Sequence, residues 1–143
     1  MTWLAIALAI ALGGALGSCA RYGIGLLFER WWPEGGGQAQ SAATLAVNVL
    51  GSALAGCLAG YLAGRSVTTV AAELVWTNGW SGIAGIAAVG LLGGFTTFSA
   101  ASVQAAQLAE SADGWPRTKA LASACLMAVA SIGAGALGFA LSR

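Results

Sequence analysis

The chain has 143 residues, of which 58% are hydrophobic and only 8% charged, and its formal net charge is +1. A soluble domain carries about 25% charged residues, and a chain this short has too much surface to bury so much apolar material in water. The composition therefore excludes an ordinary soluble domain and indicates that lipid is the solvent. We expect no nucleic-acid partner.

Long uncharged stretches predict four membrane spans. No charge occurs within residues 1–20, 35–64, 74–109 or 120–142, and a spanning helix needs about 20 apolar residues. We predict spans near residues 3–27, 42–63, 83–108 and 120–141 of a single all-α domain that covers residues 1–143, with both termini on one side. The tryptophans agree, since all lie near the ends of these spans, as the membrane interface favours: Trp3, Trp31, Trp32, Trp76, Trp80 and Trp115.

The polar segments between the spans are predicted to be short loops. The sequence "EGGGQAQSA", residues 34–42, indicates a flexible connection between the first two spans. Every carboxylate is predicted to lie in a loop or at a span boundary: Glu29, Glu34, Glu73, Glu110 and Asp113. Because histidine is also absent, the chain lacks the usual general bases and proton relays. We therefore expect no enzyme.

Small residues and charges bear on assembly. Glycines recur every four residues, which predicts close helix packing but leaves open which stripe faces which: Gly13/Gly17, Gly56/Gly60/Gly64 and Gly90/Gly94. The positive charges give a weak orientation bias, because Arg30, Arg117 and Lys119 oppose Arg65 and Arg143, and Arg21 raises the ratio only to four against two. Fixed topology and insertion in both orientations remain open.

The second span contains two polar residues on one face. Thr44 and Asn48 are four residues apart, so they share a helix face. An asparagine within a span is costly without a partner and is often functional. The alternative is an interhelical hydrogen bond worth on the order of 1 kcal/mol that only stabilises the bundle.

The third uncharged stretch, residues 74–109, is too long for one straight span. As a single helix it would extend about 54 Å, against about 30 Å of hydrocarbon. Gly93 and Gly94 predict a break, because glycine weakens a helix and tolerates unusual dihedral angles. Freed carbonyls at such a break can hold a cation, and N–H and hydroxyl groups can face an anion. A kink that serves only packing remains the alternative.

The polar residues within the spans are mostly neutral hydrogen-bond donors. Asn48, Thr44 and Ser131 contribute amide and hydroxyl groups, and Arg21 is the one cation. The positive edge of a phenylalanine ring can also face an anion. This set favours a small, strongly hydrated anion over a cation pathway lined by carboxylates.

Three blocks, "GGALGSCARYGIG", "TLAVNVLGS" and "GLLGGFTTFSA", resemble the signature blocks of the Fluc (CrcB) family of fluoride channels. The resemblance implies a dual-topology, antiparallel homodimer in the bacterial inner membrane, with two pathways that export cytoplasmic fluoride passively. It implies a fluoride pathway formed by Asn48, Thr44, Phe98, Ser99, Ser131 and Arg21. It also implies a central structural Na⁺ held by the backbone carbonyls of Gly93 and Thr96 from both subunits.

The chain departs from the family pattern at three positions. Ala101 stands where the family has a second pore phenylalanine, Ala100 replaces the preceding threonine, and Met127 replaces a tyrosine. A variant with altered permeation and one half of a heterodimer therefore stay open. Two other classes of protein are alternatives: a small multidrug exporter, which needs a membrane-embedded carboxylate, and a structural membrane protein without transport.

Overall fold

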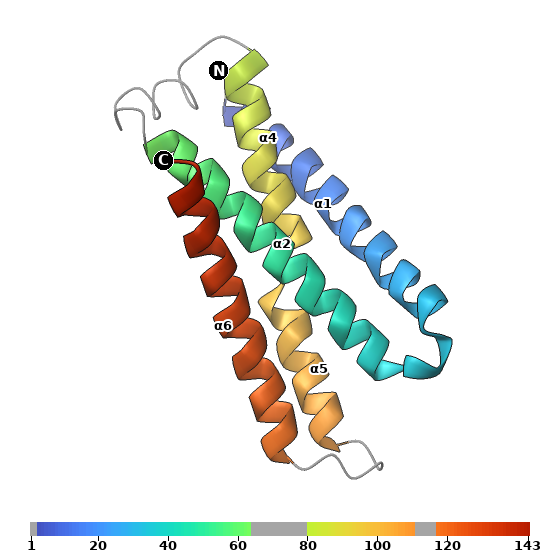
Figure 1. Cartoon of the computed structure of the whole chain (residues 1–143). Helices are drawn as coiled ribbons and strands as arrows, with labels where there is room; N and C mark the ends of the chain where they lie inside the picture. The colour runs from blue at the N-terminus through green and yellow to red at the C-terminus, as the bar shows by residue number, and fades with distance from the viewer. Residues whose placement is uncertain (1–2, 64–79, 111–116) are drawn as a thin grey trace.

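The computed structural model describes residues 3–63, 80–110 and 117–143, and these residues are almost entirely helical. In chain order the elements are α1 (Trp3–Trp31), the short 3-10 helix η1 (Pro33–Gly35), α2 (Gly37–Ala63), α4 (Trp80–Phe95), α5 (Phe98–Glu110) and α6 (Arg117–Leu141). Four stretches are long and apolar enough to cross a membrane, which confirms the predicted four-span layout. The first turn of α1 and the last turn of α6 lie at the same end of the bundle (Figure 1).

The connection between the first two spans is tighter than predicted. Helix α1 continues to Trp31, and α2 begins at Gly37, so most of the segment predicted as a flexible loop is helical. The backbone reverses at Gly36, whose φ of 46° lies in the left-handed region that glycine tolerates. Ala39 is fully buried, which explains why the polar start of α2 is held in the helix.

Helices α1 and α4 form one closely packed pair, and Figure 1 shows them crossing side by side. A side-chain Cβ at Gly13 or Gly17 would overlap the backbone of α4, at Ala87 and Leu91 respectively. Gly90 and Gly94 meet the backbone of α1 in the same way. The first and third glycine stripes therefore face each other, because only glycine lets two backbones approach this closely.

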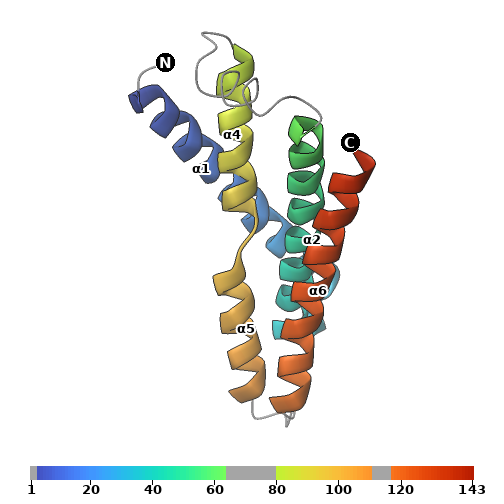
Figure 2. The same cartoon turned by 90° about the vertical axis from the view of Figure 1, so that its left-hand side faces the viewer.

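Helices α2 and α6 form the second pair. Gly56 lies against the backbone of Gly135, and Gly60 against that of Phe139. From α6, Gly138 faces Ala53. The remaining helix, α5, packs mainly on α6, so the two halves of the third span lie against different neighbours (Figure 2).

The third span is interrupted at two threonines. Helix α4 ends at Phe95 and α5 begins at Phe98, with Thr96 and Thr97 non-helical between them (Figure 2). The interruption lies just after the predicted glycine pair, since Gly93 and Gly94 both remain inside α4. Gly94 serves another purpose there: a Cβ at this position would overlap the carbonyl group of Gly14.

Much of the large apolar surface faces outward. Trp3 and Trp31, at opposite ends of α1, are 84% and 76% exposed, as expected for side chains at the two membrane interfaces. The buried apolar residues of the described chain are few and mostly small: Ala9, Ala39, Ala43, Val47, Ile86, Phe95 and Met127. Six residues named above for glycine spacing, charge or interface position lie outside the described residues: Gly64, Arg65, Glu73, Trp76, Asp113 and Trp115.

Candidate functional site

The interruption of the third span is held by Asn48 from α2. The Oδ1 atom of Asn48 accepts a hydrogen bond from the backbone N–H of Thr97 at 2.8 Å. The Nδ2 atom of Asn48 donates to the carbonyl oxygen of Thr97 at 3.0 Å. The Asn48 side chain is buried, with 8% of its surface exposed. One amide therefore satisfies both backbone groups of a non-helical residue.

These two bonds explain how the interruption is tolerated. Within hydrocarbon, each unsatisfied backbone group costs several kcal/mol, and Thr97 lies outside both flanking helices. The Nδ2 atom also lies 3.6 Å from the sulfur of Met127 on α6. A thioether is a weak acceptor, so this third contact is the easiest of the three to replace.

A cavity of about 360 Å³ lies beside the interruption, and we call it the Asn48 cavity. Phe98, the first residue of α5, lines it with a ring that is 82% exposed in the single chain. Ser131 lines it from α6, and its Oγ atom is buried without a hydrogen-bond partner. The remaining lining residues are Ser52, Thr96, Thr97, Ala101, Ser102, Ala124, Met127, Ala128 and Ile132.

Ser99 does not line this cavity. Its exposed hydroxyl lies 3.2 Å from the hydroxyl of Thr97. The structure thus brings together Asn48, Phe98 and Ser131. It places Ser99 next to them, in the first turn of α5.

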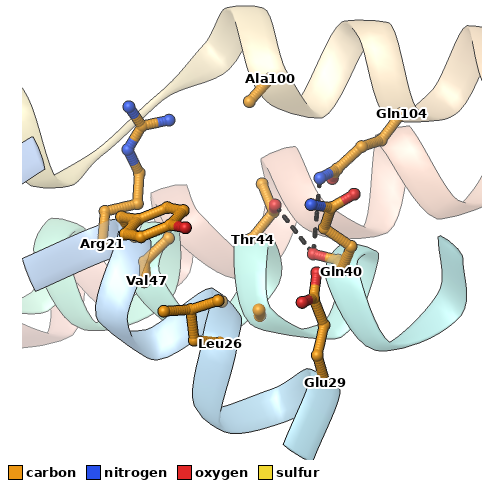
Figure 3. A pocket seen from close by; sticks show the side chains of 11 residues that line it. Arg21, Leu26, Glu29, Gln40, Thr44, Val47, Ala100 and Gln104 are labelled. Atoms are coloured by element: carbon orange, nitrogen blue, oxygen red, sulfur yellow. Dashed lines mark hydrogen bonds between the residues drawn. The ribbon is translucent and has the colours of Figure 1, made fainter. Parts of the chain in front are cut away.

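A second cavity of about 390 Å³, which we call the Arg21 cavity, lies between α1, α2 and α5 (Figure 3). Its polar lining comes from Arg21, Glu29, Gln40, Thr44 and Gln104, together with the ring of Tyr22. The Thr44 hydroxyl donates to the carbonyl oxygen of Gln40 at 3.0 Å, and the Gln104 amide donates to the same oxygen at 3.5 Å. Figure 3 shows both bonds converging on that oxygen.

The two cavities divide the polar face predicted for α2. Thr44 and Val47 line the Arg21 cavity, whereas Asn48 lines the other. Neither of these two cavities contains both Thr44 and Asn48. In the single chain, the polar side chains of α2 thus face two separate cavities, of which only the Asn48 cavity is lined by the interruption.

Gly93 and Thr96 lie on the last turn of α4 and just beyond it. The N–H and hydroxyl of Thr96 both donate to the carbonyl of Leu92, at 3.0 and 2.9 Å. Gly93 is exposed, and no heavy atom lies within 4 Å of a Cβ built on it. This open surface leaves room beside the end of α4 for another group. Backbone carbonyls are suitable ligands for a hard cation.

Sequence reasoning missed three polar residues of the Arg21 cavity: Glu29, Gln40 and Gln104. Gln104 is a half-buried amide within the third span, and the argument applied to Asn48 would have identified it. Glu29 was assigned to a loop or boundary, and it lies in the last turn of α1, at the end of the first span. Its spacing of eight residues from Arg21 on one helix was the available signal.

Comparison with known families decides the identity. A family model described as CrcB-like protein, Camphor Resistance (CrcB), matches residues 8–141. This chain belongs to the CrcB family. The family match covers all four spans, so the chain is a multi-pass membrane protein of this family.

Two bacterial relatives named fluoride-specific ion channel FluC are similar to part of the chain. The relative from Nitrobacter winogradskyi is 46% identical over 69 residues, which cover 46% of this chain and 48% of the relative. One from Caulobacter vibrioides is 44% identical over 66 residues, covering 43% and 46%. The matched part of the chain thus spans about half the length of each relative.

Two of the three positions at which the chain departs from the family pattern line the same cavity. Ala101 and Met127 both line the Asn48 cavity, whereas Ala100 lines the Arg21 cavity. The small side chain of Ala101 leaves space in the Asn48 cavity. The Met127 sulfur occupies one hydrogen-bonding position of Asn48.

Proposed function

We propose that this CrcB-family protein is a fluoride-selective channel rather than an enzyme, and that it lets fluoride leave the cytoplasm passively. The observation that carries the proposal is the Asn48 cavity, where the Asn48 amide, the exposed Phe98 ring and the unpartnered Ser131 hydroxyl meet beside an interrupted helix. The names of its relatives support the same ion.

The lining of the Asn48 cavity fits a small anion. Fluoride must lose part of its hydration inside the membrane, and hydroxyl and amide donors replace that water without a fixed charge that would trap the ion. Ser131 has a free donor, and the N–H of Asn48 that faces the Met127 sulfur exchanges a weak acceptor for a strong one. The edge of the Phe98 ring adds a weaker positive surface.

The Arg21 cavity is proposed as the entrance to this pathway. Its guanidinium attracts anions, and the Thr44 hydroxyl extends the polar lining toward the interruption. Since one chain keeps the two cavities separate, we propose that a second copy completes the route between them. Phe98 at 82% exposure and Tyr22 at 69% are large rings that a partner would cover.

We propose the antiparallel homodimer as this assembly, with one fluoride pathway along each subunit. The weak difference in positive charge between the two sides of the membrane allows insertion in both orientations. A structural Na⁺ is proposed at the symmetry axis, where the carbonyls of Gly93 and Thr96 from both copies would hold it and its charge would offset their dipoles. The open surface beside Gly93 leaves room for such a site.

Fluoride efflux from liposomes tests the function. The purified chain is reconstituted alone into vesicles loaded with potassium fluoride, valinomycin is added to balance charge, and a fluoride electrode records release. We expect release well above that from empty vesicles and no comparable release of chloride. Release no faster than from empty vesicles would contradict the proposal.

The same assay separates the two alternative classes of protein. Efflux that requires an imposed pH gradient would favour a proton-coupled exporter, because a passive channel needs only the fluoride gradient. No efflux under any gradient, from a chain that elutes as a folded species, would favour a structural protein. Cross-links between a tagged terminus and an untagged opposite loop test the antiparallel arrangement, and exclusively parallel products would contradict it.

A further inference from the structure

Two buried polar atoms in the Arg21 cavity lack a protein partner. They are the Nε atom of Arg21, which is a donor, and the Oε1 atom of Gln104, which is an acceptor. A buried polar group without a partner costs about 1–3 kcal/mol, and water normally satisfies such groups when the space is polar and large enough. The cavity has about 390 Å³, several times the roughly 30 Å³ that one water occupies. The Arg21 cavity, which we also call the vestibule, is therefore polar and large enough to hold water.

Two opposite charges share this vestibule without forming a pair. Glu29 lines it from the same helix as Arg21, eight residues further along, which corresponds to about 12 Å of helix rise. No ion pair joins these two side chains in the described structure. Figure 3 shows them on opposite sides of the cavity, with Glu29 beside Gln40.

The two charges differ in their surroundings. Arg21 is half-buried, whereas Glu29 is exposed and lies in the last turn of α1, two residues before its end at Trp31. Exposed charges are screened beyond about 8 Å at physiological ionic strength, and half-buried ones are screened less. An ion entering from water consequently meets the carboxylate at the mouth before it reaches the guanidinium inside.

We propose that Glu29 sets the charge selectivity of the hydrated Arg21 cavity by opposing Arg21. The carboxylate lowers the concentration of anions at the mouth and keeps the vestibule close to neutral. The neutral amides of Gln40 and Gln104 complete the polar lining without adding charge. Glu29 thus limits the entry of fluoride into the vestibule. This role in fluoride entry rests on the function proposed above.

Reagent charge provides a direct test that does not depend on fluoride flux. Ala100 lines the cavity, so Ala100→Cys, in the full chain with Cys19, Cys57 and Cys125 replaced by alanine, places a thiol there. Anionic sulfonatoethyl and cationic trimethylammoniumethyl methanethiosulfonates then modify it in proteoliposomes. We expect Glu29→Gln to raise the ratio of anionic to cationic modification rates at least about threefold, in line with electrostatic steering. Arg21→Gln should lower the ratio.

Two matched variants control for general effects. Glu34 in η1 is exposed, lies near the same end of α1 and does not line the cavity. Glu34→Gln removes an equal charge from the same end of the protein, so the rate ratio should stay unchanged. Glu29→Asp retains the carboxylate and should restore most of the original ratio.

The outcomes are separable from those of the flux assay. An unchanged ratio in Glu29→Gln, or an equal shift in Glu34→Gln, overturns the inference even if the protein conducts fluoride. If neither Ala100→Cys nor a second probe, Gln104→Cys, is modified in protein that elutes as a single folded species, the cavity is dry and the inference is wrong. A shifted ratio without any fluoride efflux supports the role of Glu29 and contradicts only the fluoride function. Where efflux occurs, Glu29→Gln should raise it most at low ionic strength.

Discussion

The side chain of Asn48 and the backbone of Thr97, which are 49 residues apart, form a closed pair of hydrogen bonds. The amide oxygen accepts the Thr97 N–H at 2.8 Å, and the amide nitrogen donates to the Thr97 carbonyl at 3.0 Å. This pair attaches α2 to the point at which the third span leaves one helix and enters the next. Asn48 is thus both a lining residue of the cavity and a support for the interrupted backbone.

Removing the amide should reduce stability and flux together. Asn48→Asp keeps an acceptor for the Thr97 N–H but faces the Thr97 carbonyl with a negative charge and loses the donor. We expect a decrease of about 2–3 kcal/mol in the free energy of unfolding and no fluoride flux. Denaturant titration in micelles and liposome efflux measure these two quantities.

Thr44→Val is the matched control for stability on the same helix. Among the described residues, the Thr44 hydroxyl bonds only to the carbonyl of Gln40, one turn earlier in α2. Its loss should change the free energy of unfolding by less than about 1 kcal/mol. Equal decreases in the free energy of unfolding of the two variants would show that the hydrogen bonds to Thr97 stabilise the protein no more than the Thr44 hydroxyl does.

Ser131→Ala should separate function from stability. Because the Oγ atom is buried without a partner, removing it eliminates a desolvation cost, and the free energy of unfolding should stay constant or rise by about 1 kcal/mol. Fluoride efflux should decrease because a free donor is lost from the Asn48 cavity. Ser142→Ala removes a hydroxyl that bonds within α6 and should leave efflux unchanged. A large loss of stability in Ser131→Ala would mean that the hydroxyl has a structural partner.

Ala101→Phe tests whether a second ring suits the Asn48 cavity. Ala101 lines a hollow of about 360 Å³, so a larger side chain enters existing space. We expect the Phe variant to raise fluoride efflux at least about threefold, since its edge adds positive surface along the pathway. Ala101→Leu adds bulk without an aromatic edge and should lower efflux. A decrease in both variants would indicate that the space itself is the route.

Two adjacent glycines should respond oppositely to alanine. A Cβ at Gly94 overlaps the carbonyl of Gly14 on α1, whereas one at Gly93 meets nothing within 4 Å. Gly94→Ala should cost at least about 2 kcal/mol, because the paired helices must separate or strain. Gly93→Ala should be neutral or stabilise the helix by up to about 1 kcal/mol. Thermal unfolding in micelles compares the two, and similar costs would contradict the packing of α1 on α4.

The candidate site was only partly visible in the sequence. Asn48 was identified as an amide that needs a partner in the membrane, Ser131 as a hydroxyl within the fourth span, and Phe98 through the family resemblance; the structure places all three at one cavity. The sequence did not reveal Thr97 as the partner, and it did not indicate that Thr44 faces a different hollow. Glu29 and Gln104 each carried a signal in the sequence, the eight-residue spacing from Arg21 and an amide within a span, but only the structure places them in one cavity with Arg21.

Membrane insertion and the number of spans followed from the sequence alone, because both depend on the summed transfer free energy of neighbouring residues. The tertiary structure decided where the third span is interrupted and which glycine stripes meet. A glycine pair tolerates either a broken helix or a close backbone contact, and nothing local distinguishes the two. Gly94 stays helical because Gly14 lies against it, and the interruption moves to Thr96 and Thr97, where an amide from α2 satisfies the freed backbone groups.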